Sequence, residues 1–224
     1  MKRIVYIVIL LLFFFNGFSQ KITDYFIMLP DSSVMGLTKA DRELIIKYSS
    51  DNITLNDMYN DFGAGKVQFG FEIMDTKNGY LKMVGQVMEG HIQFCYWNLL
   101  NGTKLIAAYE EGCGPACEVL QFDFYIYDGK KLTSANKDKI VPELFNDFFT
   151  GDPVKQKEEL NKADAFANVV FDLPRTGKNM VAKFGDSGSV FEYKKVLKGN
   201  RLELIWNDGT FKKGKFSWVE NLEY

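Results

Sequence analysis

The chain has 224 residues, of which 46% are hydrophobic and 15% aromatic, enough to fill a sizeable core. Its formal net charge is −2, from 27 basic and 29 acidic side chains. This balance gives no support to nucleic-acid binding, which favours a strongly basic face, and the composition is not that of a disordered chain.

The first twenty residues, MKRIVYIVILLLFFFNGFSQ, have the layout of a secretory signal peptide. Lys2 and Arg3 form a positive head, an apolar run extends from residue 4 to residue 15, and small residues end the segment near Ser19. The apolar run is shorter than the ~20 residues that a membrane-spanning helix needs. We therefore predict a signal peptide over residues 1–19, a periplasmic or secreted mature protein, and no stable membrane insertion after cleavage.

Between the leader and residue 135, the sequence predicts a helix followed by an antiparallel meander. Thr38 with Asp41 three residues later is typical of a helix N-cap and its capping-box partner, so we expect a helix from about Lys39 to Tyr48. Alternating hydrophobic and polar residues then predict five strands, and the short turns between them predict antiparallel pairing. These strands are KVQFGFEIMD, YLKMVGQVM, HIQFCYWN, TKLIAAYE and EVLQFDFYIYD.

The rest of the chain, residues 136–224, again places helices before strands. Pro142 predicts a short helix through Phe149, and the pair Asp152-Pro153 predicts the start of a second helix. Strands are expected in the segments NVVFDL, NMVAKF, SVFEYKK, RLELIW and TFKKGKFSW.

The expected fold class is α+β, with antiparallel β-meander sheets packed by a few helices. Residues 20–135 and residues 136–224 form either two similar halves or one continuous domain. A faint internal similarity favours the halves, because Trp97 and Trp206 are each followed by asparagine and a turn and lie 109 residues apart. The same pattern also arises by chance, since a strand that ends in tryptophan before a turn is common.

The segment EEGCGPACEV contains a cysteine pair, Cys113 and Cys117. Thiol–disulfide oxidoreductases separate their cysteines by two residues at a strand-to-helix junction, where the helix lowers the pKa of the first thiol. Here three residues separate the cysteines, both flanks predict strands, and Glu110, Glu111 and Glu118 supply negative charge that raises a thiol pKa. We therefore predict a structural disulfide, with free thiols or redox catalysis as the alternatives.

Cys95 is the remaining cysteine. If the Asn101-Gly102 turn fixes the hairpin, Cys95 lies opposite residues near Ala108 and about 16 Å along the strand from Cys113. Bridged Cα atoms lie within about 7 Å of each other, so Cys95 is predicted to be a buried free thiol.

The remaining candidates are weaker. His91 is the only histidine, which argues against a histidine-rich metal site, and we predict no metal, no cofactor and no catalytic residue. The string GDSGSV, with Ser187 and Ser189, is similar to the nucleophile segment GDSGG of serine proteases, but a glycine-rich turn explains it better. Tyr125 and Tyr127 share one strand face, which either forms a binding surface or is covered by a helix or by the other half.

Several segments together resemble a family of exported proteins of unknown function from Bacteroides- and Flavobacterium-type bacteria. After a leader that ends in FSQ, a segment F-x-x-x-P-D-S, from Phe26 to Ser32, leads to a helix that contains Arg42. The loop CGPAC and the aromatic strand FDFYIYD follow, and the tail RLELIWNDGTFKKGKF is similar to the family's closing strand. The cysteine pair departs from the family's pattern. The resemblance implies export and a compact α+β fold, and it brings no activity.

These observations predict an exported, non-catalytic binding or accessory protein of the bacterial envelope, whose partner is a protein or a glycan. One alternative is a periplasmic hydrolase that uses carboxylates in a cleft between the halves. Another is a protein inhibitor that presents the Cys113–Cys117 loop to a partner's active site.

Overall fold

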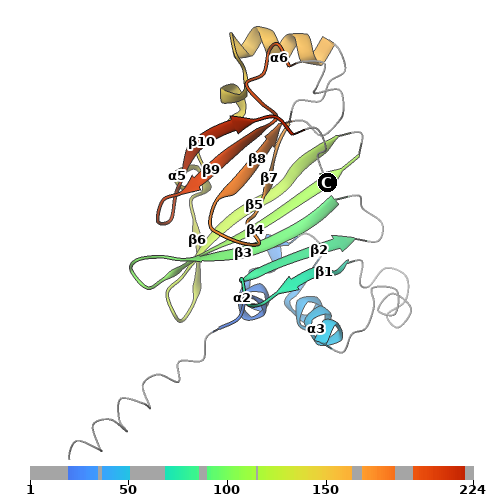
Figure 1. Ribbon diagram of the computed structural model, residues 1–224. Helices are drawn as coiled ribbons and strands as arrows, with labels where there is room; N and C mark the ends of the chain where they lie inside the picture. Colours follow the sequence, from blue (N-terminus) through green and yellow to red (C-terminus); the bar gives the residue numbers. More distant parts are fainter. Residues whose placement is uncertain are drawn as a thin grey trace, which may run out of the picture.

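The computed structural model describes residues 20–34, 37–50, 69–85, 90–114, 116–162, 168–184 and 194–219. The predicted signal peptide and the segment with Ser187 and Ser189 lie outside the described residues. The described chain forms two antiparallel sheets and a few short helices, so the predicted α+β class is confirmed (Figure 1). None of the described helices is both long and apolar enough to cross a bilayer.

The larger sheet has six strands that lie side by side in sequence order. Each turn returns the chain beside the strand that it has just left, which gives the predicted meander. All five predicted strands are present, and a sixth follows after the turn at Asp128-Gly129. The strands are β1 (Phe69–Asp75), β2 (Tyr80–Gly85), β3 (Gly90–Asn98), β4 (Lys104–Cys113), β5 (Cys117–Tyr127) and β6 (Leu132–Ala135).

The N-terminal segment covers one face of this sheet (Figure 1). It contains α2 (Ile22–Met28), the 3-10 helix η1 (Asp31–Ser33) and α3 (Lys39–Ser50). The predicted capping box of α3 is confirmed, because Thr38 N–H donates to Asp41 Oδ2 at 2.8 Å and Asp41 N–H donates to Thr38 Oγ1 at 3.3 Å. The side chains buried on this face are Ile22, Tyr25, Phe26, Leu29, Val34, Leu37, Ile45, Leu81, Met83, Ile92, Phe94, Ile106, Ala108, Tyr125 and Tyr127.

The second sheet has four strands in the order β10-β9-β8-β7 and packs against the other face of the first sheet. The β9–β10 turn uses Asp208 and Gly209, which both have positive φ, as a tight hairpin turn of this kind requires. Of the predicted strand SVFEYKK, only Lys194 and Lys195 are described, and they lie in a turn. The strands are β7 (Val169–Asp172), β8 (Met180–Phe184), β9 (Arg201–Trp206) and β10 (Phe211–Ser217).

The prediction of a helix from Pro142 to Phe149 is wrong. A short helix, α5 (Lys137–Ile140), ends before Pro142, and a 3-10 helix, η2 (Phe145–Phe148), follows it. Val141 is extended, with φ −110° and ψ 124°. Proline disfavours the helical conformation in the residue before it, which separates the two elements.

The helix predicted after Asp152 is confirmed as α6 (Pro153–Lys162). Asp152 Oδ1 accepts a hydrogen bond from Val154 N–H at 3.0 Å, as expected of an N-cap residue. Leu160 is buried in the core, whereas Val154 is 68% exposed.

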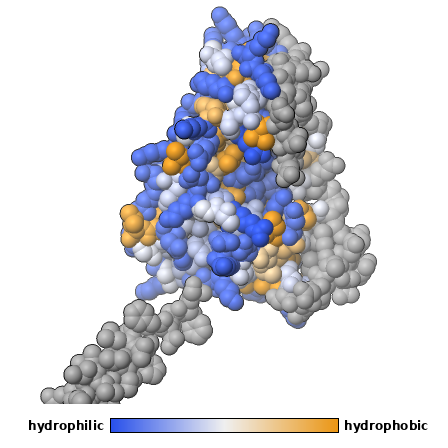
Figure 2. Space-filling view, viewed as in Figure 1, coloured by the Kyte–Doolittle hydropathy of each residue, from blue (hydrophilic) through white to orange (hydrophobic). Residues whose placement is uncertain are grey.

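The two sheets share one core. Trp97 of β3 and Trp206 of β9 stack with ring centroids 5.3 Å apart, and Phe211 lies edge-on against both rings. The two tryptophans of the predicted internal similarity therefore meet between the sheets, while a duplication of the halves stays a prediction. On the outside, Figure 2 shows hydrophilic side chains over most of the described face, with hydrophobic ones in small separate groups.

Candidate functional site

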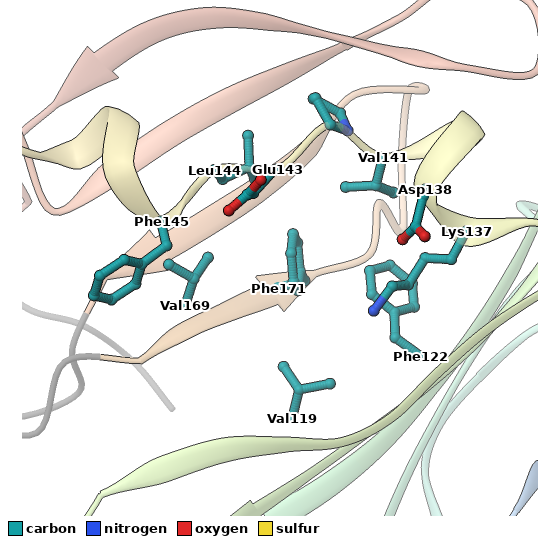
Figure 3. A pocket seen from close by; sticks show the side chains of 11 residues that line it. Val119, Phe122, Lys137, Asp138, Val141, Glu143, Leu144, Phe145, Val169 and Phe171 are labelled. Carbon is teal, nitrogen blue, oxygen red and sulfur yellow. The ribbon is translucent and has the colours of Figure 1, made fainter. Parts of the chain in front are cut away.

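A pocket of about 710 Å³ opens where β5 lies beside β7. Its walls come from these two strands and from the segment that contains α5 and the start of η2 (Figure 3). Most of the lining side chains are apolar. They are Val119, Phe122, Val141, Pro142, Leu144, Phe145, Val169 and Phe171, with the charged residues Lys137, Asp138 and Glu143.

Side chains of two facing strands form the apolar interior of the pocket. The rings of Phe122 and Phe171 have centroids 4.9 Å apart. Val119 lines the same pocket as Phe122, although residues three apart on a regular strand point to opposite faces. The register of β5 shifts opposite Glu110 and Glu111, and this bulge returns Val119 to the inner face.

Charged side chains lie at the mouth of the pocket. Lys137, Asp138 and Glu143 are exposed, whereas Val141 and Leu144 are buried. Figure 3 shows the carboxylates of Asp138 and Glu143 well apart in the view. The pocket thus has an apolar interior and a charged mouth, and neither of its two carboxylates is buried.

A buried polar network lies where the start of β3 pairs with the end of β4. Tyr109 Oη donates to Glu111 Oε2 at 2.6 Å, and Glu111 Oε1 lies 3.8 Å from His91 Nδ1 and 3.6 Å from Cys113 Sγ. The amide nitrogen of Gln93 lies 2.5 Å from His91 Nε2. Because an amide nitrogen is a donor, His91 Nε2 accepts there and its proton resides on Nδ1.

His91 also lines a second, polar pocket of about 190 Å³. Burial, followed by the charges of Lys82 and Lys183, lowers the pKa of His91 to about 4, so the ring is neutral at pH 7. Lys82 pairs with Glu72, and Lys183 pairs with Asp172, each at 2.9 Å. Because each lysine is already paired with a carboxylate, these two positive charges do not make the pocket a binding site for an anion.

The predicted disulfide between Cys113 and Cys117 is confirmed. The two residues are direct cross-strand partners at the end of the β4–β5 hairpin. Asn168 Nδ2 donates to the carbonyl oxygen of Cys117 at 3.2 Å, which ties the hairpin to the chain that leads into β7. Both cysteines are strand residues. The described part of the hairpin therefore supplies no helix N-terminus that would activate a thiolate.

Cys95 is a buried free cysteine, as predicted. It lies opposite Ala107, one residue from the predicted register. Burial raises the pKa of its thiol well above the usual value.

Tyr125 and Tyr127 do not form an exposed binding surface, which corrects that expectation. Each is only 6% exposed, because the N-terminal segment covers their face of the sheet. The Tyr125 hydroxyl shares a hydrogen bond of 2.5 Å with Ser33 Oγ, and the Tyr127 ring packs on Tyr25 with centroids 5.1 Å apart. The alternative that a helix covers this face is confirmed.

The pocket and the buried network were not identified from sequence. The pocket lining comes from three separate segments, which share no motif. The register predicted from the Asn101-Gly102 turn would place His91 opposite Gly112. The observed register is one residue away and places His91 opposite Glu111, so only the structure brings these two side chains together.

No protein-family model matches the chain, and no curated protein matches it. Among solved structures, a domain of an uncharacterized protein from Porphyromonas gingivalis W83 is similar, with a TM-score of 0.57 and 12% sequence identity over 86% of this chain and 97% of that chain. At this identity the similarity shows the fold alone. The organism belongs to the Bacteroidetes, in partial agreement with the resemblance to exported proteins from that group.

Proposed function

We propose that the protein is an exported, non-catalytic binding protein of the bacterial envelope that takes up an apolar molecule in the pocket between β5 and β7. The observation that carries this proposal is the character of the pocket, with apolar walls, a volume of about 710 Å³ and charged side chains at its mouth. Small-molecule sites are typically concave, mostly apolar and roughly 300–1,000 Å³ in volume.

The pocket favours a ligand with an apolar body and a polar end. Phe122, Phe145 and Phe171 offer aromatic surface to the body, and Lys137 at the mouth offers a positive charge to an acidic end group. The glycan or protein partner expected from Tyr125 and Tyr127 loses its support, because those side chains are buried. The pocket takes their place as the binding site.

Two observations support export. The leader has the layout of a signal peptide, and the Cys113–Cys117 disulfide is of a kind that persists in oxidising compartments outside the cytosol.

The two alternative functions have less support. A carboxylate hydrolase requires an acid and a base in a sheltered cleft, whereas Asp138 and Glu143 at the pocket are both exposed. An inhibitor requires a projecting loop, whereas Cys117 is buried and Asn168 holds its carbonyl oxygen. Both alternatives stay open to direct assay.

Binding of the apolar dye N-phenyl-1-naphthylamine to the mature protein tests the proposal. We expect a saturable rise in dye emission with one site per chain, and displacement of the dye by long-chain fatty acids. Val119→Trp fills the pocket and should weaken dye binding by at least about tenfold, which is ~1.4 kcal/mol. Val154→Trp, on an exposed face of α6, is the matched control and should bind the dye as the wild type does.

The proposal fails if Val119→Trp retains the circular dichroism spectrum of the wild type and binds the dye equally well. Dye binding that the Val154→Trp control also loses would equally contradict it, because the pocket would then not be the site. Thermal unfolding of both variants verifies that each is folded at the assay temperature.

A further inference from the structure

Four side chains of metal-ligating type lie on one face of the sheet near the end of the β4–β5 hairpin. His91 is the cross-strand partner of Glu111, and Cys113 is the partner of Cys117. Glu111 and Cys113 are two residues apart on β4, and such residues point to the same face of a strand. The strand register thus brings together an imidazole, a carboxylate and two sulfurs.

The distances among Glu111, Cys113 and Cys117 already resemble those between ligands of one metal ion, and His91 lies next to Glu111 at the edge of this group. Glu111 Oε1 lies 3.6 Å from Cys113 Sγ and 3.8 Å from His91 Nδ1. The ligand atoms of Glu111, Cys113 and Cys117 all lie within 4.8 Å of one another. In a tetrahedral zinc site with bonds of about 2.0–2.3 Å, neighbouring ligand atoms are roughly 3.3–3.8 Å apart.

Tyr109 holds the carboxylate in the orientation that such a site needs. Its hydroxyl donates to Glu111 Oε2 and leaves Oε1 directed toward the sulfur and the imidazole. Hydrogen bonds that orient a ligand in this way are typical of metal sites. Glu111 and His91 are buried, whereas Cys113 is partly exposed and gives a reductant access to the disulfide.

We propose that His91, Glu111, Cys113 and Cys117 bind a zinc ion when the disulfide is reduced. Disulfide and zinc exclude each other, because sulfurs that are bonded together cannot both bind a metal as thiolates. The three residues between the cysteines fall within the spacing of about two to four that structural zinc sites use. Zinc suits this mixture of thiolate, imidazole and carboxylate better than magnesium or calcium, which prefer oxygen ligands.

Electrons and protons balance in the exchange between the disulfide form and the zinc-bound form. A dithiol reductant gives two electrons and two protons to the Cys113–Cys117 bond and becomes a disulfide itself. Zn²⁺ then displaces the two thiol protons. The His91 proton moves from Nδ1 to Nε2, which frees Nδ1 for the metal and requires the Gln93 amide to turn from its present contact. In the reverse direction, a disulfide oxidant takes two electrons from the two thiolates and two protons from water and becomes a dithiol, which re-forms the Cys113–Cys117 bond and releases the ion.

Zinc binding by the mature protein in its two redox states tests the site. The reduced sample is prepared with a phosphine, which donates electrons without supplying thiol ligands. We expect one zinc per chain in the reduced protein, measured by competition with a chromophoric chelator, and none in the oxidised protein. X-ray absorption at the zinc edge should show two sulfur and two nitrogen or oxygen neighbours. Failure of the folded, reduced protein to bind zinc, or a zinc shell without sulfur, would overturn the proposal.

Variants identify the ligands. His91→Gln and Glu111→Gln should each weaken zinc binding by at least about tenfold, and Cys113→Ser should reduce the sulfur neighbours of the zinc from two to one. Glu110→Gln is the matched control, because Glu110 lies next to Glu111 on β4 and points to the opposite face. Wild-type affinity in both His91→Gln and Glu111→Gln would show that the ligand set is wrong. The X-ray absorption spectrum of the wild type identifies the zinc neighbours without any variant, so the proposal can be decided even where a variant fails to fold.

Discussion

Arg42 is a charged residue that is fully buried within the N-terminal segment. Its Nη1 donates to the carbonyl oxygen of Leu37 at 2.7 Å, and its Nη2 donates to that of Leu29 at 2.5 Å. Nη2 also lies 3.2 Å from Asp31 Oδ1. One side chain thus connects α3 to the loop after α2. The arginine in the helix and the P-D-S segment of the sequence resemblance therefore belong to one structural unit.

Removing this guanidinium should destabilise the protein. We expect Arg42→Met to lower the free energy of unfolding by about 2–4 kcal/mol, because buried carbonyl oxygens lose their donors. Lys39→Met is the control and should change it by less than about 0.5 kcal/mol, since the Lys39 side chain is 63% exposed. Urea unfolding followed by tryptophan fluorescence measures both. Equal stability of the two variants would contradict the structural role of Arg42.

The burial of Cys95 predicts that its thiol reacts slowly with alkylating reagents in the native protein. Its burial excludes reagents and raises the pKa of the thiol, so little reactive thiolate is present at neutral pH. We expect iodoacetamide to leave Cys95 unmodified in the native protein at pH 8 and to modify it completely in urea. Peptide mass spectrometry of the two samples reads the outcome, and rapid modification of the native protein would show that the thiol is accessible.

At the scale of elements, the β4–β5 hairpin depends on a covalent link near its turn. The chain-entropy estimate for so short a loop is about 2 kcal/mol. We expect the double substitution Cys113→Ala, Cys117→Ala to lower the free energy of unfolding by about that amount. The measurement is made with a chelator present, so that zinc does not contribute. Reduced wild type should show a similar loss, and a double variant as stable as the oxidised protein would contradict the prediction.

Some helices and strands can be predicted from the local sequence alone. The helix at Lys39 and the strands of the meander follow from a capping pair and from alternation, which are properties of neighbours in the chain. The wrong helix prediction at Pro142 also has a local cause. Proline favours an extended conformation in the residue before it, here Val141, and this effect outweighs its tendency to begin a helix. α2 had no predicted type, because a short apolar cluster suits a buried helix as well as a strand.

At the scale of the whole molecule, the two sheets share one core. Trp97, Leu105 and Phe124 of the first sheet are buried against the second sheet and the segment between them. We expect residues 20–224 to unfold in one cooperative transition, and a fragment of residues 20–135 not to fold alone, because it would expose this face to water. Circular dichroism and amide proton dispersion of the fragment check this. A folded fragment would show that the halves are separate domains.

The sequence by itself determined the fold class, the meander, the helix caps and the cysteine pairing, because alternation, turns and short cysteine spacing act over a few residues. Only the tertiary structure decided that Tyr125 and Tyr127 are covered, that β5, β7 and the α5–η2 segment enclose a pocket, and that His91 lies beside Glu111. These features depend on which faces pack together and on strand register. The residue pattern of a strand face is the same whether helices or water cover it, so the covering is known only once the rest of the chain is folded.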